Sequence, residues 1–194
     1  MKKTVSIFLL FLLLFLVLWM TPVKFYFYKR FIHDIVPDTL NLPEKNKDVI
    51  RYIELKGKSL APSYKMVVCT EYVINVLKNF NTLSESDKAK IRIITNKDLK
   101  TLILNDSDVI KGVYNYLVST DNGISINNIN DVRSGDFIQF WNIGFGSPIG
   151  HCGIIRGIDI ENGLICLYSS SPTTDGFGKQ MYVIPERYYI ARLK

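Results

Sequence analysis

The spacing of apolar and polar positions changes near residue 123, and before that point it is helical. In the segment 63–80 the apolar residues Val68, Tyr72, Val73, Val76, Leu77 and Phe80 fall on one helical stripe. The segments 84–95 and 105–119 predict two further helices, with Ser84 or Ser86 and Asp106 or Ser107 as the capping residues. Asp121-Asn122-Gly123 is expected to end this helical region.

Beyond residue 123 the pattern becomes one of short strands. Strands are expected at 136–141, 152–158, 164–168, 179–185 and 188–193, with a glycine-rich loop over 143–150. Asn162-Gly163 predicts a hairpin turn, because both residues tolerate positive φ. Helices followed by an antiparallel sheet predict an α+β domain.

The N-terminal residues differ in composition from the rest of the chain. Thr4 to Met20 carry no charge and follow two lysines, and no small-residue cleavage motif comes after them. The run is near the lower length limit for a transmembrane helix. We therefore expect an uncleaved signal anchor over 1–22, a juxtamembrane connector over 23–44 and a domain over 45–194. A cleaved signal peptide is the alternative. The usual export route would make the protein single-pass, bound to the membrane through this helix, with its domain outside the cytoplasm.

The charge and the cysteine content bear on the environment of the protein and on the state of its thiols. The formal net charge is +6, but the basic residues are scattered. This favours an anionic environment such as phospholipid or teichoic acid, and no nucleic-acid site is predicted. The three cysteines leave at least one thiol free. Cys152 and Cys166 could form a disulfide across the hairpin, or both could be small buried apolar residues.

The chemistry-bearing residues are a cysteine and a histidine. Cys69 lies at the start of the first predicted helix, where a thiol can become a nucleophile if its pKa is lowered and an imidazole takes its proton. His151 opens a strand after Gly150, whereas the other histidine, His33, lies in the connector. The candidates for a third group that orients the imidazole are Ser169 and Ser170, together with Ser171.

Three segments of this chain resemble the papain-like cysteine amidases and peptidases of the NlpC and CHAP type. The segment Cys69-Thr70-Glu71-Tyr72-Val73 is similar to the CHAP nucleophile segment. The segment 133–140 resembles the Pro-Gly-Asp-Leu-Val-x-Phe step that opens the sheet in both families, and 150–155 resembles their Gly-His-Val-Gly-Ile-Tyr strand. The resemblance covers roughly 63–193 and implies a papain-like fold, with the nucleophile helix packed on the sheet.

The same resemblance implies an activity. Cys69 would be the nucleophile and His151 the general base of a hydrolase that forms a thioester acyl-enzyme. Its substrate would be an amide bond in a peptidoglycan stem peptide or a related peptide, and no metal or organic cofactor is implied. Trp141 is a candidate for the substrate groove. Tyr72 is a second candidate, although core packing is the preferred interpretation for it.

Three departures from the family pattern keep other functions open. Val68 precedes the nucleophile where NlpC proteins often have Asp. Cys152 follows the histidine where the family has Val or Ala, and the third position offers serines where the family has His, Asn, Gln or Glu. The alternative is a catalytically silent papain-like module that binds a cell-wall peptide or a protein partner. A transferase or deamidase could use the same Cys–His pair.

Overall fold

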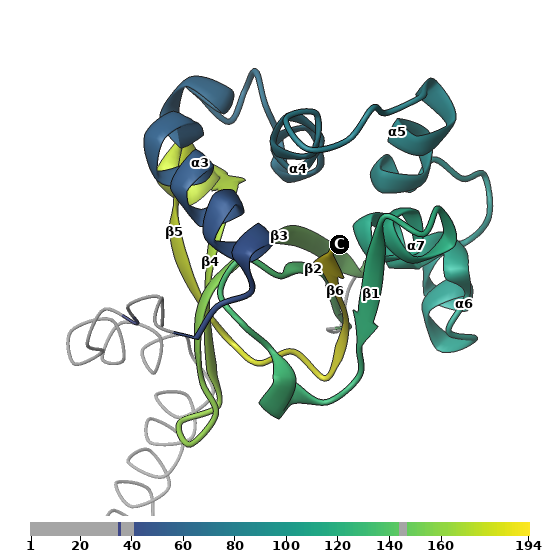
Figure 1. Ribbon diagram of the computed structural model, residues 1–194. Coiled ribbons are helices and arrows are strands. Elements are labelled where there is room, and N and C mark those ends of the chain that lie inside the picture. Colours follow the sequence, from purple (N-terminus) through teal and green to yellow (C-terminus); the bar gives the residue numbers. More distant parts are fainter. Residues whose placement is uncertain (1–34, 36–40, 144–146) are drawn as a thin grey trace, which may run out of the picture. The chain divides into compact units, whose positions relative to one another are not determined.

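The computed structural model describes residue 35 and residues 41–143 and 147–194. These residues contain a six-stranded antiparallel sheet with strand order β1-β6-β2-β3-β4-β5 (Figure 1). The strands are β1 (Gly123–Ile126), β2 (Phe137–Asn142), β3 (Ile149–Asp159), β4 (Leu164–Ser171), β5 (Gly176–Val183) and β6 (Arg187–Leu193). The predicted α+β class is confirmed, with the helices preceding the sheet along the chain.

The helices lie mainly on one face of the sheet (Figure 1). They are α3 (Glu44–Leu60), α4 (Cys69–Leu77), α5 (Glu85–Arg92), α6 (Leu99–Leu104) and α7 (Gly112–Ser119), with short 3-10 turns at Asp108–Lys111, Ile129–Asp131 and Pro172–Thr174. Helix α4 packs on β3 and β4, α7 packs on β1, β2 and β6, and α3 packs beside α4 and β5. The helix predicted from the apolar stripe is therefore present, and it packs between α3 and α5.

The sheet has an apolar core on each of its faces. Phe137 and Ile154 join the core that lies under α3, α4 and α7. Ile138 and Phe140 belong to a second core on the other face, because successive side chains of a strand point to opposite sides. This second core also contains Ile126 of the edge strand β1, and Tyr182 of the opposite edge strand β5 packs against it. The second core therefore extends across the sheet from one edge strand to the other.

A buried carboxylate connects the two ends of this domain. Asp136 is fully buried and accepts hydrogen bonds from Asn46 of α3 (2.8 Å), from the Arg133 backbone N–H (2.8 Å) and from two nitrogens of Arg192 in β6 (both 2.8 Å). Asn46 also donates to the carbonyl of Ser134. Asp136 therefore braces the turn that precedes β2. The structure adds that this turn is tied to the first helix and to the last strand.

Several boundaries differ from the sequence-based expectations. Helix α3 and strand β1 were not predicted, and the single helix expected over 105–119 is two segments that break at Gly112, whose φ is 49°. The segment 84–95 is helical only to Arg92, because Ile93 adopts a left-handed conformation after it. Ser84, which was one of the two predicted caps, forms a capping box with Asp87 at the start of this helix. The hairpin turn forms at the predicted place, but it spans four residues, and only Gly163 among them has positive φ.

The predicted signal anchor over 1–22 and nearly all of the connector lie outside the described residues, as does His33. Among the helices of the described part of the chain, none is both long enough and apolar enough to span a membrane.

Candidate active site

Helix α4 begins with its candidate nucleophile. Its N-cap residue is Val68, which has extended backbone angles and makes no side-chain capping hydrogen bond. The N–H groups in the first turn of a helix have no partner within the helix, and the helix dipole favours negative charge there. Cys69 is the first helical residue and is partly buried. Its sulfur therefore lies where a thiolate is stabilised.

The loop that leads into this helix is fixed by hydrogen bonds to the end of the sheet. The hydroxyl of Ser170 donates to the carbonyl of Val67, two residues before the nucleophile. The backbone N–H of Tyr64 donates to the carboxylate of Asp175 at 3.2 Å. The backbone N–H of Phe177 donates to Ala61 at 2.9 Å. Contacts from β4, β5 and the turn between them thus set the position of the helix start.

His151 lies near the start of β3, directly opposite Phe140 of β2. Its ring is flanked by Phe140, with ring centroids 5.7 Å apart, and by Tyr182 of β5, with centroids 5.5 Å apart. The preceding residue, Gly150, has no room for a side chain, because a Cβ would lie 2.7 Å from the ring of Trp141. Aromatic packing on two sides therefore restricts the imidazole to one place.

The sulfur of Cys69 contacts His151 and also the next residue, Cys152. Hydrogen bonding by the Cys152 thiol is the largest influence that lowers the pKa of Cys69, and the imidazole of His151 and the backbone N–H of Cys152 add to it. Burial acts in the opposite direction, but the pKa of Cys69 is still lowered to about 4. The pKa of the buried Cys152 thiol is raised, by its hydrogen bond to Cys69 and by burial. At neutral pH the pair is therefore one thiolate with one thiol as its donor.

Cys69 lies beside two consecutive side chains of β3. Cys152 belongs to the core under the helices, whereas the ring of His151 packs with Phe140 and Tyr182 at the second core. The ladder between β3 and β4 begins at Ile154, and beyond it the Ser169 hydroxyl of β4 donates to the Cys152 carbonyl of β3. Helix α4 packs on both of these strands.

The serines predicted as third catalytic residues are close to the site, but they bond to backbone groups. Ser169 donates to the carbonyl of Cys152 at 2.8 Å, and Ser170 donates to the carbonyl of Val67. Both side chains are fully buried. The Nε2 atom of His151 is buried and has no hydrogen-bond partner among the described residues. The structure therefore brings Cys69 and His151 together, and it places the two serines where they hold the backbone on either side of the pair.

The two residues predicted to contact substrate are both buried. Tyr72 has no exposed surface and packs against Phe177, as the core interpretation expected. Trp141 is 6% exposed, and its indole N–H donates to the carbonyl of Ile110 at 2.8 Å. Exposed apolar side chains are instead found next to each catalytic candidate. Met66 and Val68 precede Cys69, and Ile149 precedes His151. These three are the better candidates for contact with a substrate.

Two tyrosines near the thiol were missed by the sequence analysis. Burial raises the pKa of Tyr182, and the charge of the Cys69 thiolate adds to this effect. Burial and the same thiolate raise the pKa of Tyr64. No motif in the sequence marks either residue, because Tyr64 comes from the preceding loop and Tyr182 from an edge strand.

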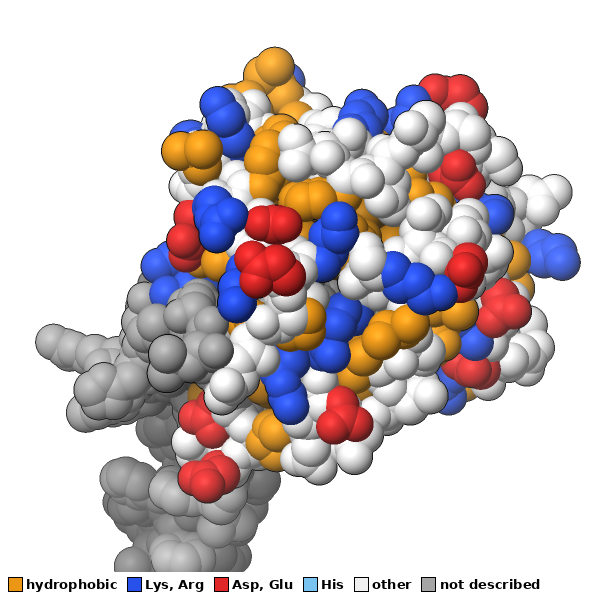
Figure 2. Space-filling view, in the orientation of Figure 1, with side chains coloured by type: hydrophobic (Ala, Val, Ile, Leu, Met, Phe, Trp, Pro, Cys, Tyr) orange, Lys and Arg blue, Asp and Glu red, His pale blue; other side chains and the backbone are white. Residues whose placement is uncertain are grey.

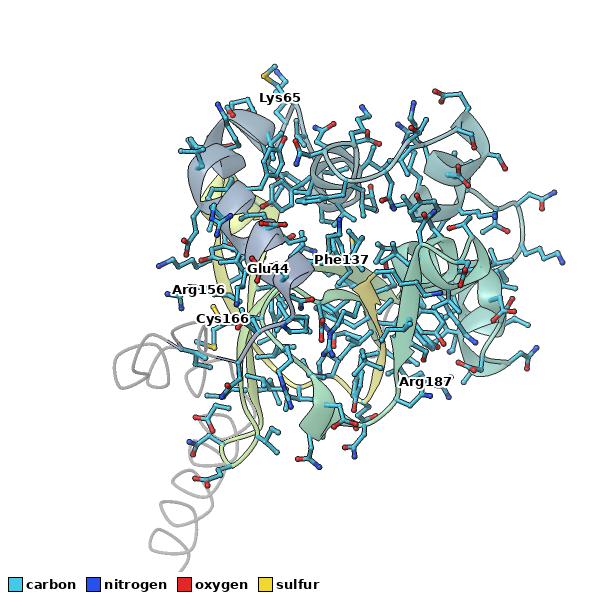
Figure 3. The ribbon with its side chains drawn as sticks, viewed as in Figure 1. Glu44, Lys65, Phe137, Arg156, Cys166 and Arg187 are labelled. Atoms are coloured by element: carbon cyan, nitrogen blue, oxygen red, sulfur yellow. The ribbon has the colours of Figure 1, made fainter. Side chains whose placement is uncertain are left out.

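The third cysteine is remote from this pair. Cys166 lies on β4 opposite Gly157, and none of the three cysteines forms a disulfide. Figure 3 shows Cys166 far from Lys65, which lies in the loop before α4. The disulfide between Cys152 and Cys166 that the sequence left open is therefore not formed.

The described residues around the pair form no cluster that could hold a metal ion. Within the described residues, no group of three or more His, Cys, Asp or Glu side chains is arranged to hold a metal ion. Two surface hollows are lined by residues of α3 and by residues around β6, and neither includes Cys69 or His151. On the face seen in Figure 2, basic side chains are spread out and interleaved with acidic ones.

Comparison of the chain with protein-family models, with curated proteins and with solved structures finds no match.

Proposed function

We propose that this protein is a membrane-anchored cysteine hydrolase that cleaves amide bonds in peptidoglycan stem peptides or related peptides. The observation that carries the proposal is the contact between the Cys69 sulfur, at the start of α4, and the imidazole of His151. The likeness of three segments to NlpC and CHAP enzymes supports the substrate class. The uncharged run from Thr4 to Met20 supports the anchor.

The reaction proceeds in two steps. The thiolate of Cys69 attacks the carbonyl carbon of the substrate, the C–N bond breaks, and the protonated His151 gives its proton to the leaving amine. Water then attacks the thioester with His151 as the base, which releases the acid and regenerates the thiolate. The N–H groups at the start of α4 are free of a side-chain cap, so they are placed to stabilise the oxyanion of each tetrahedral intermediate.

Digestion of purified peptidoglycan by the full-length protein in detergent tests this proposal. Soluble products are separated by liquid chromatography, and the cleaved bond is identified by mass spectrometry. We expect products from the wild type and from Cys166→Ser, because Cys166 is remote from the site, and none from Cys69→Ser or His151→Ala. Unchanged products from Cys69→Ser would refute the assignment of the nucleophile.

One observation favours a second function, that of a catalytically silent binding module. The Nε2 atom of His151 has no hydrogen-bond partner in the described part of the chain, so no third side chain is seen that holds this nitrogen as in a catalytic triad. A silent module would retain stem peptides equally well in the wild type and in Cys69→Ser, and it would release no products. Binding of the peptide measured by calorimetry on both proteins, beside the digestion assay, separates the two functions.

A further inference from the structure

A second thiol beside a candidate nucleophile is not needed for amide hydrolysis. The mechanism above uses Cys69, His151 and backbone N–H groups, and it gives Cys152 no step. Yet Cys152 is 1% exposed, it faces α4, and its thiol contacts the Cys69 sulfur. The two cysteines are 83 positions apart in the sequence, and they meet because α4 packs on β3.

We propose that Cys69 and Cys152 form an oxidation site, at which a peroxide converts the pair to a reversible disulfide. The site takes hydrogen peroxide or a small organic hydroperoxide. That the disulfide also switches off a hydrolase rests on the function proposed above, whereas the oxidation itself does not.

The chemistry balances with the peroxide as the only oxidant. The Cys69 thiolate attacks one peroxide oxygen, the O–O bond breaks, and a sulfenic acid forms while the other oxygen leaves as water after taking a proton. The Cys152 sulfur then attacks the sulfenic sulfur, an S–S bond forms, and the hydroxyl leaves as a second water with the proton from Cys152. Two thiols have lost two electrons, and the peroxide has gained them.

The burial and charge of the two sulfurs favour this order of events. Cys69 is the more accessible and is the thiolate, which is the form that peroxides oxidise. Cys152 stays a thiol partly because the negative sulfur of Cys69 lies beside it. Oxidation of Cys69 to the uncharged sulfenic acid removes that charge, so Cys152 becomes a better nucleophile at the moment when it is needed. Condensation would also protect Cys69 from irreversible oxidation to the sulfinic acid.

The positions of Lys and Arg make the proposal simple to test by mass spectrometry. Trypsin places the three cysteines on three different peptides, 66–78 for Cys69, 134–156 for Cys152 and 157–179 for Cys166. The full-length protein in detergent is treated with hydrogen peroxide, its remaining thiols are alkylated after denaturation, and it is digested without reductant. A parallel sample is treated with dithiothreitol before alkylation. The matched variants are Cys152→Ser and Cys166→Ser.

We expect a crosslinked species of peptides 66–78 and 134–156 that lacks the mass of two hydrogen atoms, while 157–179 is alkylated in full. Dithiothreitol should abolish the crosslink. Cys166→Ser should behave as the wild type, whereas Cys152→Ser should form no crosslink and should accumulate a dimedone adduct of the sulfenic acid on 66–78. The proposal is overturned if the wild type oxidises Cys69 to the sulfinic acid while Cys152 stays alkylatable. A crosslink to Cys166 or between two chains would also overturn it.

The two proposals fail separately in this design. If the crosslink forms but no peptidoglycan product is ever seen, the hydrolase function fails and the oxidation site stands. If peptidoglycan is cleaved but no crosslink forms, only the oxidation site fails. Where both hold, peroxide should remove activity from the wild type, and dithiothreitol should restore it.

Discussion

Alkylation of Cys69 across the pH range is the measurement that most directly examines the candidate site. The pKa of Cys69 is lowered to about 4, mainly by the hydrogen bond of Cys152 and then by His151. A free cysteine has a pKa of about 8.5. At pH 5 about 90% of Cys69 would be thiolate, against roughly 0.03% of an ordinary thiol, which is a ratio of about 3,000.

The rate advantage is smaller than this ratio, because a less basic thiolate is a weaker nucleophile. With a Brønsted coefficient of about 0.4–0.5, a pKa lower by about 4.5 weakens the thiolate about 100-fold. Cys69 should therefore react about 30-fold faster than glutathione at pH 5, at a similar rate near pH ~6.5, and about 50-fold more slowly at pH ~8.5. The shape of the profile, rather than the rate at one pH, is the diagnostic quantity.

The assay uses iodoacetamide on the full-length protein from pH 5 to 9, with peptide 66–78 quantified by mass spectrometry and glutathione as the reference thiol. We expect a nearly flat profile for Cys69. A rate that rises about tenfold with each pH unit up to pH ~8 would refute the reasoning, because that is how an ordinary thiol behaves.

Variants assign the cause of the low pKa. A hydrogen bond to a charged group contributes about 1.5–3 kcal/mol, and one pKa unit corresponds to about 1.4 kcal/mol. Cys152→Ala should therefore move the labelling midpoint of Cys69 up by about 1–2 pH units, and His151→Ala should also move it up. An unchanged midpoint in Cys152→Ala would show that its thiol is not the donor.

Three further predictions concern the scaffold around the site, each measured by urea unfolding. Gly57→Ala should destabilise the protein by about 1–3 kcal/mol, because the new Cβ would lie 2.4–2.7 Å from the ring of Phe177. This loss is expected although alanine normally favours a helix. Adding Phe177→Leu should recover the lost stability. Arg192→Ala should cost about 3–5 kcal/mol, because it leaves the buried Asp136 without its cation, and a loss below about 1 kcal/mol would contradict this. Ser170→Ala should lower the free energy of unfolding by about 1–3 kcal/mol, because it removes the hydrogen bond to the Val67 carbonyl. It should also slow the alkylation of Cys69 without moving the pH midpoint of that reaction. A moved pH midpoint would instead indicate a direct electrostatic role of Ser170.

Local signals were sufficient for the parts of the fold that follow a strong pattern. The stripe of segment 63–80 predicted α4, and Asn162-Gly163 predicted the turn between β3 and β4, because both depend on residues close together in sequence. Helix α3 was missed because its segment is highly charged, and its only buried apolar side chains are Val49, Ile50 and Ile53. Its packing depends on Phe177 approaching the bare backbone of Gly57, a contact between residues 120 positions apart.

Local signals in the sequence also pointed to part of the candidate site. Cys69 and His151 were identifiable because few other residues in the chain offer nucleophile and base chemistry, and because each opens a patterned element. The contact of Cys69 with Cys152 was not predictable, since it depends on how α4 packs on β3. The backbone hydrogen bonds of Ser169 and Ser170 depend on how β4 packs against β3 and against the loop before α4.

The buried carboxylate of Asp136 has a consequence for the timing of assembly. It receives Asn46 from the first helix of the domain and Arg192 from the last strand, so its surroundings are complete only when β6 is in place. During synthesis the chain contains Cys69 and His151 before it contains Arg192. During that interval the carboxylate has no cation, and the sheet lacks the strand between β1 and β2. We therefore expect the thiol and the imidazole to reach their final geometry only after the last strand has been synthesised.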